Sequence, residues 1–302
     1  MKATLRINNE NNQVFLENIS ASQSFQLNAY ERLHYLDQSF INPQLKNVDT
    51  AVICVHGNPS WSWYYRHYFY PEQKHRIIAV DHLGMGLSSK VSRYVSVEEH
   101  AVNLYRLVES LKIRKVHLVV HDWGGVIGLS AFMNKKIEIL SVIGMNTSFF
   151  HRKNFPWRIF LATRSPWNSL LNKQLGVFSK AASYMTTHNA LDTSTRGQYQ
   201  FPYQTPEQRQ GIVNFLQDIP WFKSSKNFHF VKNCEDYMRH LSIPMMAIWG
   251  LQDFCFDQSY MDYWKTICPQ LEKHGFTDAG HWCFEDKTSE ILKLSNDFWS
   301  LL

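Results

Sequence analysis

The stretch that decides the fold is Val116-His-Leu-Val-Val-His-Asp-Trp-Gly-Gly125. Its first five residues are mostly apolar and β-branched, which is typical of a short buried strand. Asp122 follows, and a helical pattern continues from the two glycines to residue 133. Glycines at such a junction permit a strained turn and let the helix pack close to the sheet. The stretch predicts a nucleophile elbow with Asp122 as the nucleophile, although an aspartate that only caps a helix fits the same local pattern.

Short apolar runs of the same kind occur on both sides of this elbow. They cover residues 51–55, 76–80, 139–145 and 245–249, with a further candidate strand at 32–36. Residues 97–111 carry apolar side chains at helical spacing between two of these runs. Strands that alternate with helices predict an α/β fold with a mostly parallel central sheet flanked by helices. Ligands of such a sheet bind at the carboxyl ends of its strands.

The strand pattern stops between residues 149 and 240. This region contains helical patterns such as residues 209–216, and prolines and tryptophans interrupt it. We therefore expect a helical cap at 149–240, inserted into a core domain made of residues 1–148 and 241–302. A cap above the strand ends would exclude water from a site at that edge of the sheet.

Composition argues against several classes of protein. The chain has 302 residues, of which 44% are hydrophobic and 15% aromatic, but no apolar run is long enough for a signal peptide or a bilayer span. We therefore expect a cytoplasmic protein without a transmembrane segment. Five scattered cysteines indicate reduced thiols rather than a disulfide framework or a zinc site. No metal and no cofactor are expected.

The net charge of +5 is unevenly distributed along the chain. Residues 150–232 contain eleven Lys or Arg but only three Asp or Glu. No basic cluster is dense enough to indicate a nucleic-acid partner. Such an excess is most often a solvated face, and the alternative is a surface that binds an acidic partner enzyme of a lipid pathway or a membrane.

Two partners for Asp122 follow in the order nucleophile, acid, histidine that α/β-hydrolases use. Asp253 comes just after the run at 245–249, and His281 ends the stretch Asp-Ala-Gly-His. Asp257 competes for the role of the acid, but Asp253 is closer to the strand end. A carboxylate that attacks carbon forms an ester, which a base-activated water or an elimination must then resolve. We predict His281 as the base and Asp253 as the residue that orients it.

Asn58 and Trp123 are candidates for binding an anion beside the nucleophile. The side-chain amide of Asn58 and the indole N–H of Trp123 are both donors, and the backbone N–H groups at these positions can form an oxyanion hole. A turn asparagine before Pro59 and a core tryptophan are the structural alternatives.

These motifs resemble those of the haloalkane dehalogenases, α/β-hydrolases with a helical cap, over almost the whole chain. The stretches that carry the resemblance are residues 56–62, 81–88, 121–125 and 278–281. A closer similarity is to the subgroup that includes bacterial β-lactone decarboxylases of long-chain olefin biosynthesis. It rests on residues 154–159, 215–220 and 249–256. The chain departs from most relatives at Ser89 and at residues 282–284.

The resemblance implies Asp122 as nucleophile, His281 as base, Asp253 as acid, and Asn58 with Trp123 as anion stabilisers. It favours decarboxylation of hydrophobic, long-chain cis-β-lactones to alkene and carbon dioxide. Hydrolytic dehalogenation is the alternative. An epoxide hydrolase, which polarises its substrate with cap tyrosines, is less favoured, as is a non-catalytic ligand-binding relative. Tyrosines in the expected cap that suit an epoxide hydrolase are Tyr184, Tyr199 and Tyr203.

Overall fold

The computed structural model describes residues 21–151 and 166–302. An eight-stranded sheet forms its centre, in the order β1-β2-β4-β3-β5-β6-β7-β8. The strands are β1 (Ser22–Gln26), β2 (Arg32–Asp37), β3 (Thr50–Val55), β4 (Ile77–Val80), β5 (Lys115–Asp122), β6 (Glu138–Thr147), β7 (Met245–Gly250) and β8 (Glu272–Phe276). From β4 to β8 all neighbouring strands are parallel, whereas β1 and β2 join as antiparallel strands at one edge. The expected α/β fold with a mostly parallel sheet is confirmed.

The two edge strands, β1 and β8, lie outside the runs identified from the sequence. Their residues are Ser-Gln-Ser-Phe-Gln and Glu-Lys-His-Gly-Phe, and neither strand contains a fully buried position. An edge strand has one paired neighbour and little covered surface, so it needs few apolar side chains. Hydrophobic patterning therefore identifies the buried strands β3 to β7 but not these edges.

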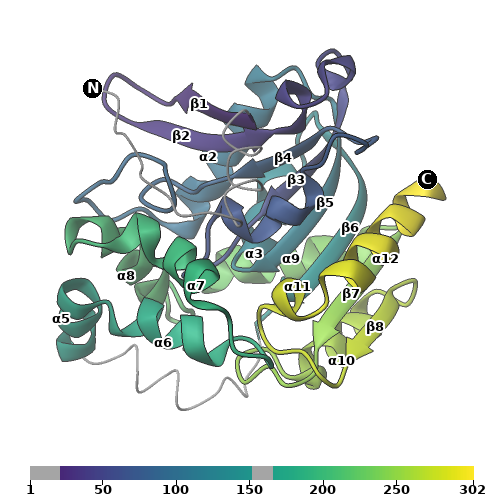
Figure 1. Ribbon diagram of the computed structural model, residues 1–302. Helices are drawn as coiled ribbons and strands as arrows, with labels where there is room; N and C mark the ends of the chain where they lie inside the picture. Colours follow the sequence, from purple (N-terminus) through teal and green to yellow (C-terminus); the bar gives the residue numbers. More distant parts are fainter. Residues whose placement is uncertain (1–20, 152–165) are drawn as a thin grey trace.

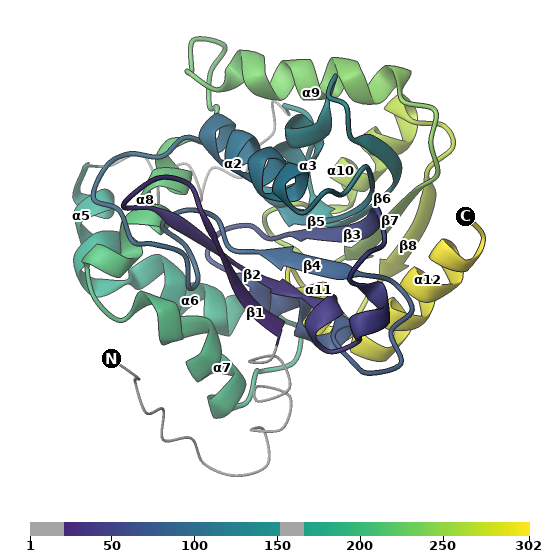
Figure 2. The ribbon, with the colours of Figure 1, turned by 90° about the horizontal axis from the view of Figure 1, so that it is seen from above.

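Helices cover both faces of the sheet. Figure 2 shows α2, α3 and α9 on one side and α11 and α12 on the other. The helices of the core are α2 (Val97–Ser110), α3 (Gly124–Phe132), α10 (Gln258–Ile267), α11 (Cys283–Asp286) and α12 (Thr288–Ser300), with 3₁₀ turns η1 (Gln38–Phe40), η2 (Pro43–Leu45) and η3 (Ser62–Tyr68). Helix α2 matches the expected helix, and its N-cap is Ser96, whose side chain accepts a hydrogen bond from the backbone N–H of Glu99.

A second group of helices lies beside the core, below the sheet in Figure 1. It consists of α5 (Pro166–Leu175), α6 (Val177–Met185), α7 (Thr193–Gln200), η4 (Phe201–Tyr203), η5 (Glu207–Arg209) and α8 (Gln210–Gln217). Helix α8 matches the expected helix at 209–216. The remaining helix before β7 is α9 (Phe228–His240), whose Cys234 thiol contacts the carbonyl of Val126 in α3.

The division of the chain into a core and a cap at residues 149 and 240 stays a prediction. Residues 154–159, which carry part of the resemblance, lie outside the described residues. None of the helices in residues 21–151 and 166–302 has the length and apolar character needed to cross a bilayer.

Candidate active site

Asp122 lies at the sharp junction between β5 and α3. Its φ is +52°, a value that residues other than glycine rarely adopt and that costs roughly 1–3 kcal/mol. The surrounding contacts hold this conformation, because the hydroxyl of Thr147 at the end of β6 donates a 2.6 Å hydrogen bond to the Asp122 carbonyl. The strand, strained turn and helix have the geometry expected of a nucleophile elbow.

Two glycines allow the chain segments of the site to approach one another. A Cβ at position 124 would lie 1.9 Å from the carbonyl oxygen of Val55, so Gly124 lets α3 pack against the end of β3. A Cβ at position 57 would lie 2.1 Å from Oδ1 of Asp122. The loop after β3 can therefore reach the carboxylate of Asp122 only because Gly57 has no side chain.

Backbone N–H groups donate to the Asp122 carboxylate. The N–H of Asn58 donates to Oδ1 at 2.8 Å, and the N–H of Trp123 also donates to the carboxylate. Burial raises the pKa of Asp122, and the nearby His281 with these N–H groups only partly offsets that effect. Oδ2, the oxygen that does not accept from the N–H of Asn58, lies 3.8 Å from Nε2 of His281.

His281 and Asp253 form the second part of the site. Nδ1 of His281 lies 2.8 Å from Oδ2 of Asp253, and both side chains are buried. Burial of His281 opposes its protonation, but the charges of Asp253 and Asp122 outweigh burial and raise its pKa. The structure thus brings Asp122, His281 and Asp253 together, although their catalytic roles stay a prediction.

Asp257, the alternative acid, and His274, a histidine close to His281 in the sequence, make other contacts. Asp257 is the N-cap of α10, where its Oδ1 accepts from the backbone N–H of Ser259 at 2.9 Å. His274 is on β8, and its Nε2 lies 2.6 Å from a carboxylate oxygen of Glu272. Both contacts are local, so the geometry favours Asp253 over Asp257.

Asn146, at the end of β6, holds Asp253 in place. Its side-chain Nδ2 donates to Oδ2 of Asp253 at 2.9 Å and to the carbonyl of Gly250 at 3.0 Å, while its Oδ1 accepts from the N–H of Gly250 at 2.8 Å. The N–H of Cys255 donates to the other oxygen of Asp253 at 2.6 Å. Sequence reasoning did not assign a role to Asn146, and its only signal was a polar residue directly after a buried strand.

Asn58 and Trp123 flank the nucleophile, as expected, and both contact α8. Nδ2 of Asn58 donates to the carbonyl of Ile212 at 3.3 Å, which leaves its second hydrogen for a ligand. The rings of Trp123 and Phe215 lie 5.9 Å apart between their centroids. The anion-binding role of both side chains stays a prediction, and α8 is the element that would complete their pocket.

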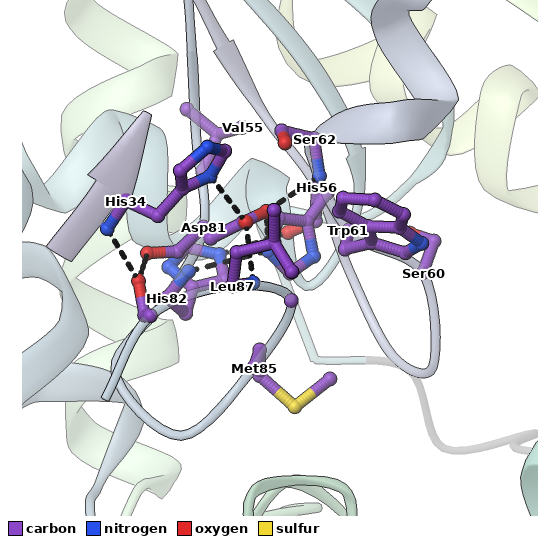
Figure 3. A network of polar contacts seen from close by, with 12 residues as sticks. His34, Val55, His56, Ser60, Trp61, Ser62, Asp81, His82, Met85 and Leu87 are labelled. Atoms are coloured by element: carbon purple, nitrogen blue, oxygen red, sulfur yellow. Dashed lines mark hydrogen bonds and ion pairs between the residues drawn. The ribbon is translucent and has the colours of Figure 1, made fainter. Parts of the chain in front are cut away.

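Asp81 contacts Ser62, Leu87 and His34 (Figure 3). This fully buried carboxylate accepts the backbone N–H of Ser62 at 2.6 Å and that of Leu87 at 2.8 Å, and lies 2.7 Å from Nδ1 of His34. Burial opposes its ionisation, yet the hydrogen bond and charge of His34 and the other donors hold its pKa below the usual range. Asp81 thus joins the loops after β3 and β4, a role that the sequence motif alone did not reveal.

Two of the three tyrosines of the expected cap have hydroxyl groups that are already engaged. The Tyr199 hydroxyl donates to Glu285, and that of Tyr203 donates to the carbonyl of Ser60 at 3.0 Å. Tyr184 is exposed at the molecular surface. None of these contacts favours an epoxide hydrolase. Within the part of the chain that the structure describes, no group of His, Cys, Asp and Glu is arranged to hold a metal ion.

Comparison with known proteins agrees with this fold. The family model described as the alpha/beta hydrolase fold matches residues 50–288. The chain therefore belongs to the α/β-hydrolases, and within them it is haloalkane dehalogenase-like.

Two proteins with assigned names are more similar in sequence to this chain than the family model alone indicates. A protein of Shewanella oneidensis named cis-3-alkyl-4-alkyloxetan-2-one decarboxylase is 31% identical over 271 residues, which cover 86% of this chain and 83% of the relative. A protein of the same name from Xanthomonas campestris is 30% identical over 256 residues, which cover 80% and 85% of the two chains. The crystal structure of the haloalkane dehalogenase DatA from Agrobacterium tumefaciens has a TM-score of 0.80 at 18% identity, and covers 93% of this chain and 97% of its own.

Proposed function

We propose that this protein is a cofactor-free β-lactone decarboxylase that converts long-chain, cis-disubstituted β-lactones to alkene and carbon dioxide. The observation that carries the proposal is the largely buried Asp122 carboxylate, with Oδ1 held by the N–H of Asn58 and Oδ2 near His281, in a chain 31% identical to a protein named as an oxetan-2-one decarboxylase. An oxetan-2-one is a β-lactone, so the name of that relative specifies the ring that the site would receive.

Oδ2 of Asp122 can attack either of two carbon atoms of the lactone ring. Attack on the sp³ carbon that bears the ring oxygen forms an alkyl ester on Asp122 and releases the ring carboxylate. Loss of carbon dioxide then supplies the electron pair of the new C=C bond, and cleavage of the C–O bond returns the Asp122 carboxylate. Attack on the carbonyl carbon, which gives an acyl-enzyme and an alkoxide, is the other route. The first route consumes no water, which suits a site enclosed by α8.

The remaining residues have roles that follow from their positions. Asn58 and Trp123 would bind the carboxylate that develops when the ring opens, because their donors flank Asp122. His281, with its pKa raised by Asp253 and Asp122, supplies positive charge beside the same anion. Asn146 and Asp253 fix the ring orientation of His281.

The experiment that tests this proposal uses two substrates in parallel. Purified protein is incubated with a cis-3,4-dialkyl β-lactone and, separately, with 1-bromobutane, and alkene is measured by gas chromatography and bromide by titration. We expect alkene with little bromide. Rapid bromide release without alkene would reject decarboxylation.

Hydrolytic dehalogenation is the second candidate, and one distance favours it. Nε2 of His281 lies 3.8 Å from Oδ2 of Asp122, so the histidine is near enough to direct a water molecule at an ester formed on that oxygen. Asn58 and Trp123 would bind the halide in the same way as a carboxylate. Bromide release in the assay above identifies this reaction.

A further inference from the structure

Helices α5 and α6 lie at the margin of the molecule (Figures 1 and 2), and both carry exposed apolar side chains. Seven large apolar side chains on these helices are 44–75% exposed. They form what we call the α5–α6 surface: Trp167, Leu170, Leu171, Leu175, Val177, Tyr184 and Met185. Single exposed apolar residues are common, but seven within two consecutive helices mark an interaction site.

Most large apolar side chains of these two helices are exposed, although Phe178 on α6 is partly buried against the core. Among the α5 residues whose burial is described, the buried one is Asn172, whose Oδ1 accepts from the N–H of Phe178 at 3.0 Å. On α6 the buried residues are Ser179, Ala182 and Ser183. A helix of a soluble domain normally buries its apolar side and exposes its polar side. The exposed apolar side chains indicate that the outward side of α5 and α6 has an apolar partner.

The charge of this region restricts what that partner can be. The two helices contain two lysines, Lys173 and Lys180, and no acidic residue. The Arg196 guanidinium lies 4.3 Å from the centroid of the Tyr184 ring on the same surface. A second copy of the chain that docked through the same surface would bring like charges together, whereas an anionic bilayer attracts lysine and arginine. Tryptophan and tyrosine are also typical of the bilayer interface.

We infer that the α5–α6 surface binds the interface of an anionic phospholipid membrane, with the apolar side chains inserted among the lipids and the basic residues at the headgroups. The surface is joined to the candidate active site through the end of α6. The carbonyl of Thr186, one residue beyond α6, accepts a 2.8 Å hydrogen bond from the N–H of Trp282, next to His281. A docked protein would therefore hold its active-site loop close to the membrane, where long-chain lipophilic molecules are concentrated.

Co-sedimentation with vesicles tests this inference without any substrate. The protein is mixed with vesicles of phosphatidylglycerol and phosphatidylcholine, or with vesicles of phosphatidylcholine alone, at low and high salt. We expect binding to the anionic vesicles, weakened by salt. The double variant Leu170→Glu/Leu171→Glu should bind roughly tenfold more weakly or worse, because two inserted side chains are lost. Lys173→Gln/Lys180→Gln should lose roughly fivefold for each lysine at low salt.

Val102→Glu is the matched control, because Val102 is 54% exposed on α2, outside the α5–α6 surface. This variant should bind vesicles as well as the unmodified protein. The inference would be overturned if the Leu170→Glu/Leu171→Glu variant bound anionic vesicles as well as the unmodified protein does. It would also be overturned if the unmodified protein did not bind these vesicles. Light scattering provides a further check. If the unmodified protein is a dimer and the Leu170→Glu/Leu171→Glu variant is a monomer, the partner of the surface is a second copy of the chain and the inference is overturned. Failure of vesicle binding would leave the proposed reaction untouched, because that reaction is measured separately, with a cis-3,4-dialkyl β-lactone and no vesicles.

Discussion

The side-chain amide of Asn146 donates a 2.9 Å hydrogen bond to Oδ2 of Asp253, the same oxygen that lies 2.8 Å from Nδ1 of His281. One carboxylate oxygen thus connects the ends of β6 and β7 to the histidine. The amide of Asn146 is in turn fixed by the backbone of Gly250. This arrangement makes Asn146 a positioning residue that acts through Asp253.

Replacement of Asn146 by alanine should therefore impair turnover more than substrate binding. We expect kcat to fall roughly 10–100-fold with a small change in KM, because the orientation of His281 matters in the transition state. Steady-state kinetics with the β-lactone measure both values. Asn172→Ala, which removes a buried asparagine on α5, is the control, and an equal loss of kcat in that variant would attribute the effect to general destabilisation.

Substitution of the nucleophile should separate activity from stability. Burial raises the pKa of Asp122, so its ionised form destabilises the folded state at neutral pH. Asp122→Asn removes that charge and should raise the melting temperature at pH 7. The ionised carboxylate lowers the free energy of unfolding at pH values above the folded pKa of Asp122. This effect disappears as pH falls below the ordinary pKa of an aspartate, so the melting temperatures of the two proteins should converge in acid. Thermal unfolding across pH provides the measurement, and a less stable Asp122→Asn at pH 7 would contradict this account.

His281 should titrate above the ordinary histidine pKa of 6.5 because Asp253 and Asp122 stabilise its charged form. A raised folded pKa means that the histidine contributes stability below 6.5, and that this contribution is lost as pH rises through the folded pKa. Asp253→Asn should move the titration to lower pH. Long-range ¹H–¹⁵N NMR spectra of the imidazole resolve the midpoint, and an unchanged midpoint in Asp253→Asn would show that the pair is not coupled.

Loss of Asp81 should destabilise the fold strongly. Asp81→Ala leaves the N–H groups of Ser62 and Leu87 and the ring of His34 without their acceptor, and breaking a buried pair costs roughly 3–5 kcal/mol. Because its folded pKa is lowered, this contribution is present at neutral pH and is lost as pH falls through that lowered pKa. Urea unfolding measures the change. Asp262→Ala, which breaks a surface ion pair with Lys273, should cost at most about 1 kcal/mol, and a similar cost for both would contradict the role of Asp81.

The elements that could be predicted from the sequence are those that follow from local pattern. The buried strands, the elbow at Asp122 and the order of Asp253 and His281 leave direct signals, since apolar runs and glycine turns are properties of short stretches. Asn146 and Asp81 leave weaker ones, because their partners come from other strands and only the sheet brings them together. The exposure of Leu170 and Leu171 could not be predicted from the sequence either. Helical spacing shows that a helix has an apolar side, but not whether that side faces the core or the solvent.

Alkene formation by the unmodified protein and by Asp122→Asn, measured with a cis-3,4-dialkyl β-lactone, tests the central claim most directly. We expect the unmodified protein to release alkene and carbon dioxide in equal amounts, and a folded Asp122→Asn to lose roughly a thousandfold or more of that rate, as nucleophile variants do. Alkene production that survives in Asp122→Asn, or a folded unmodified protein that forms none, would contradict the account.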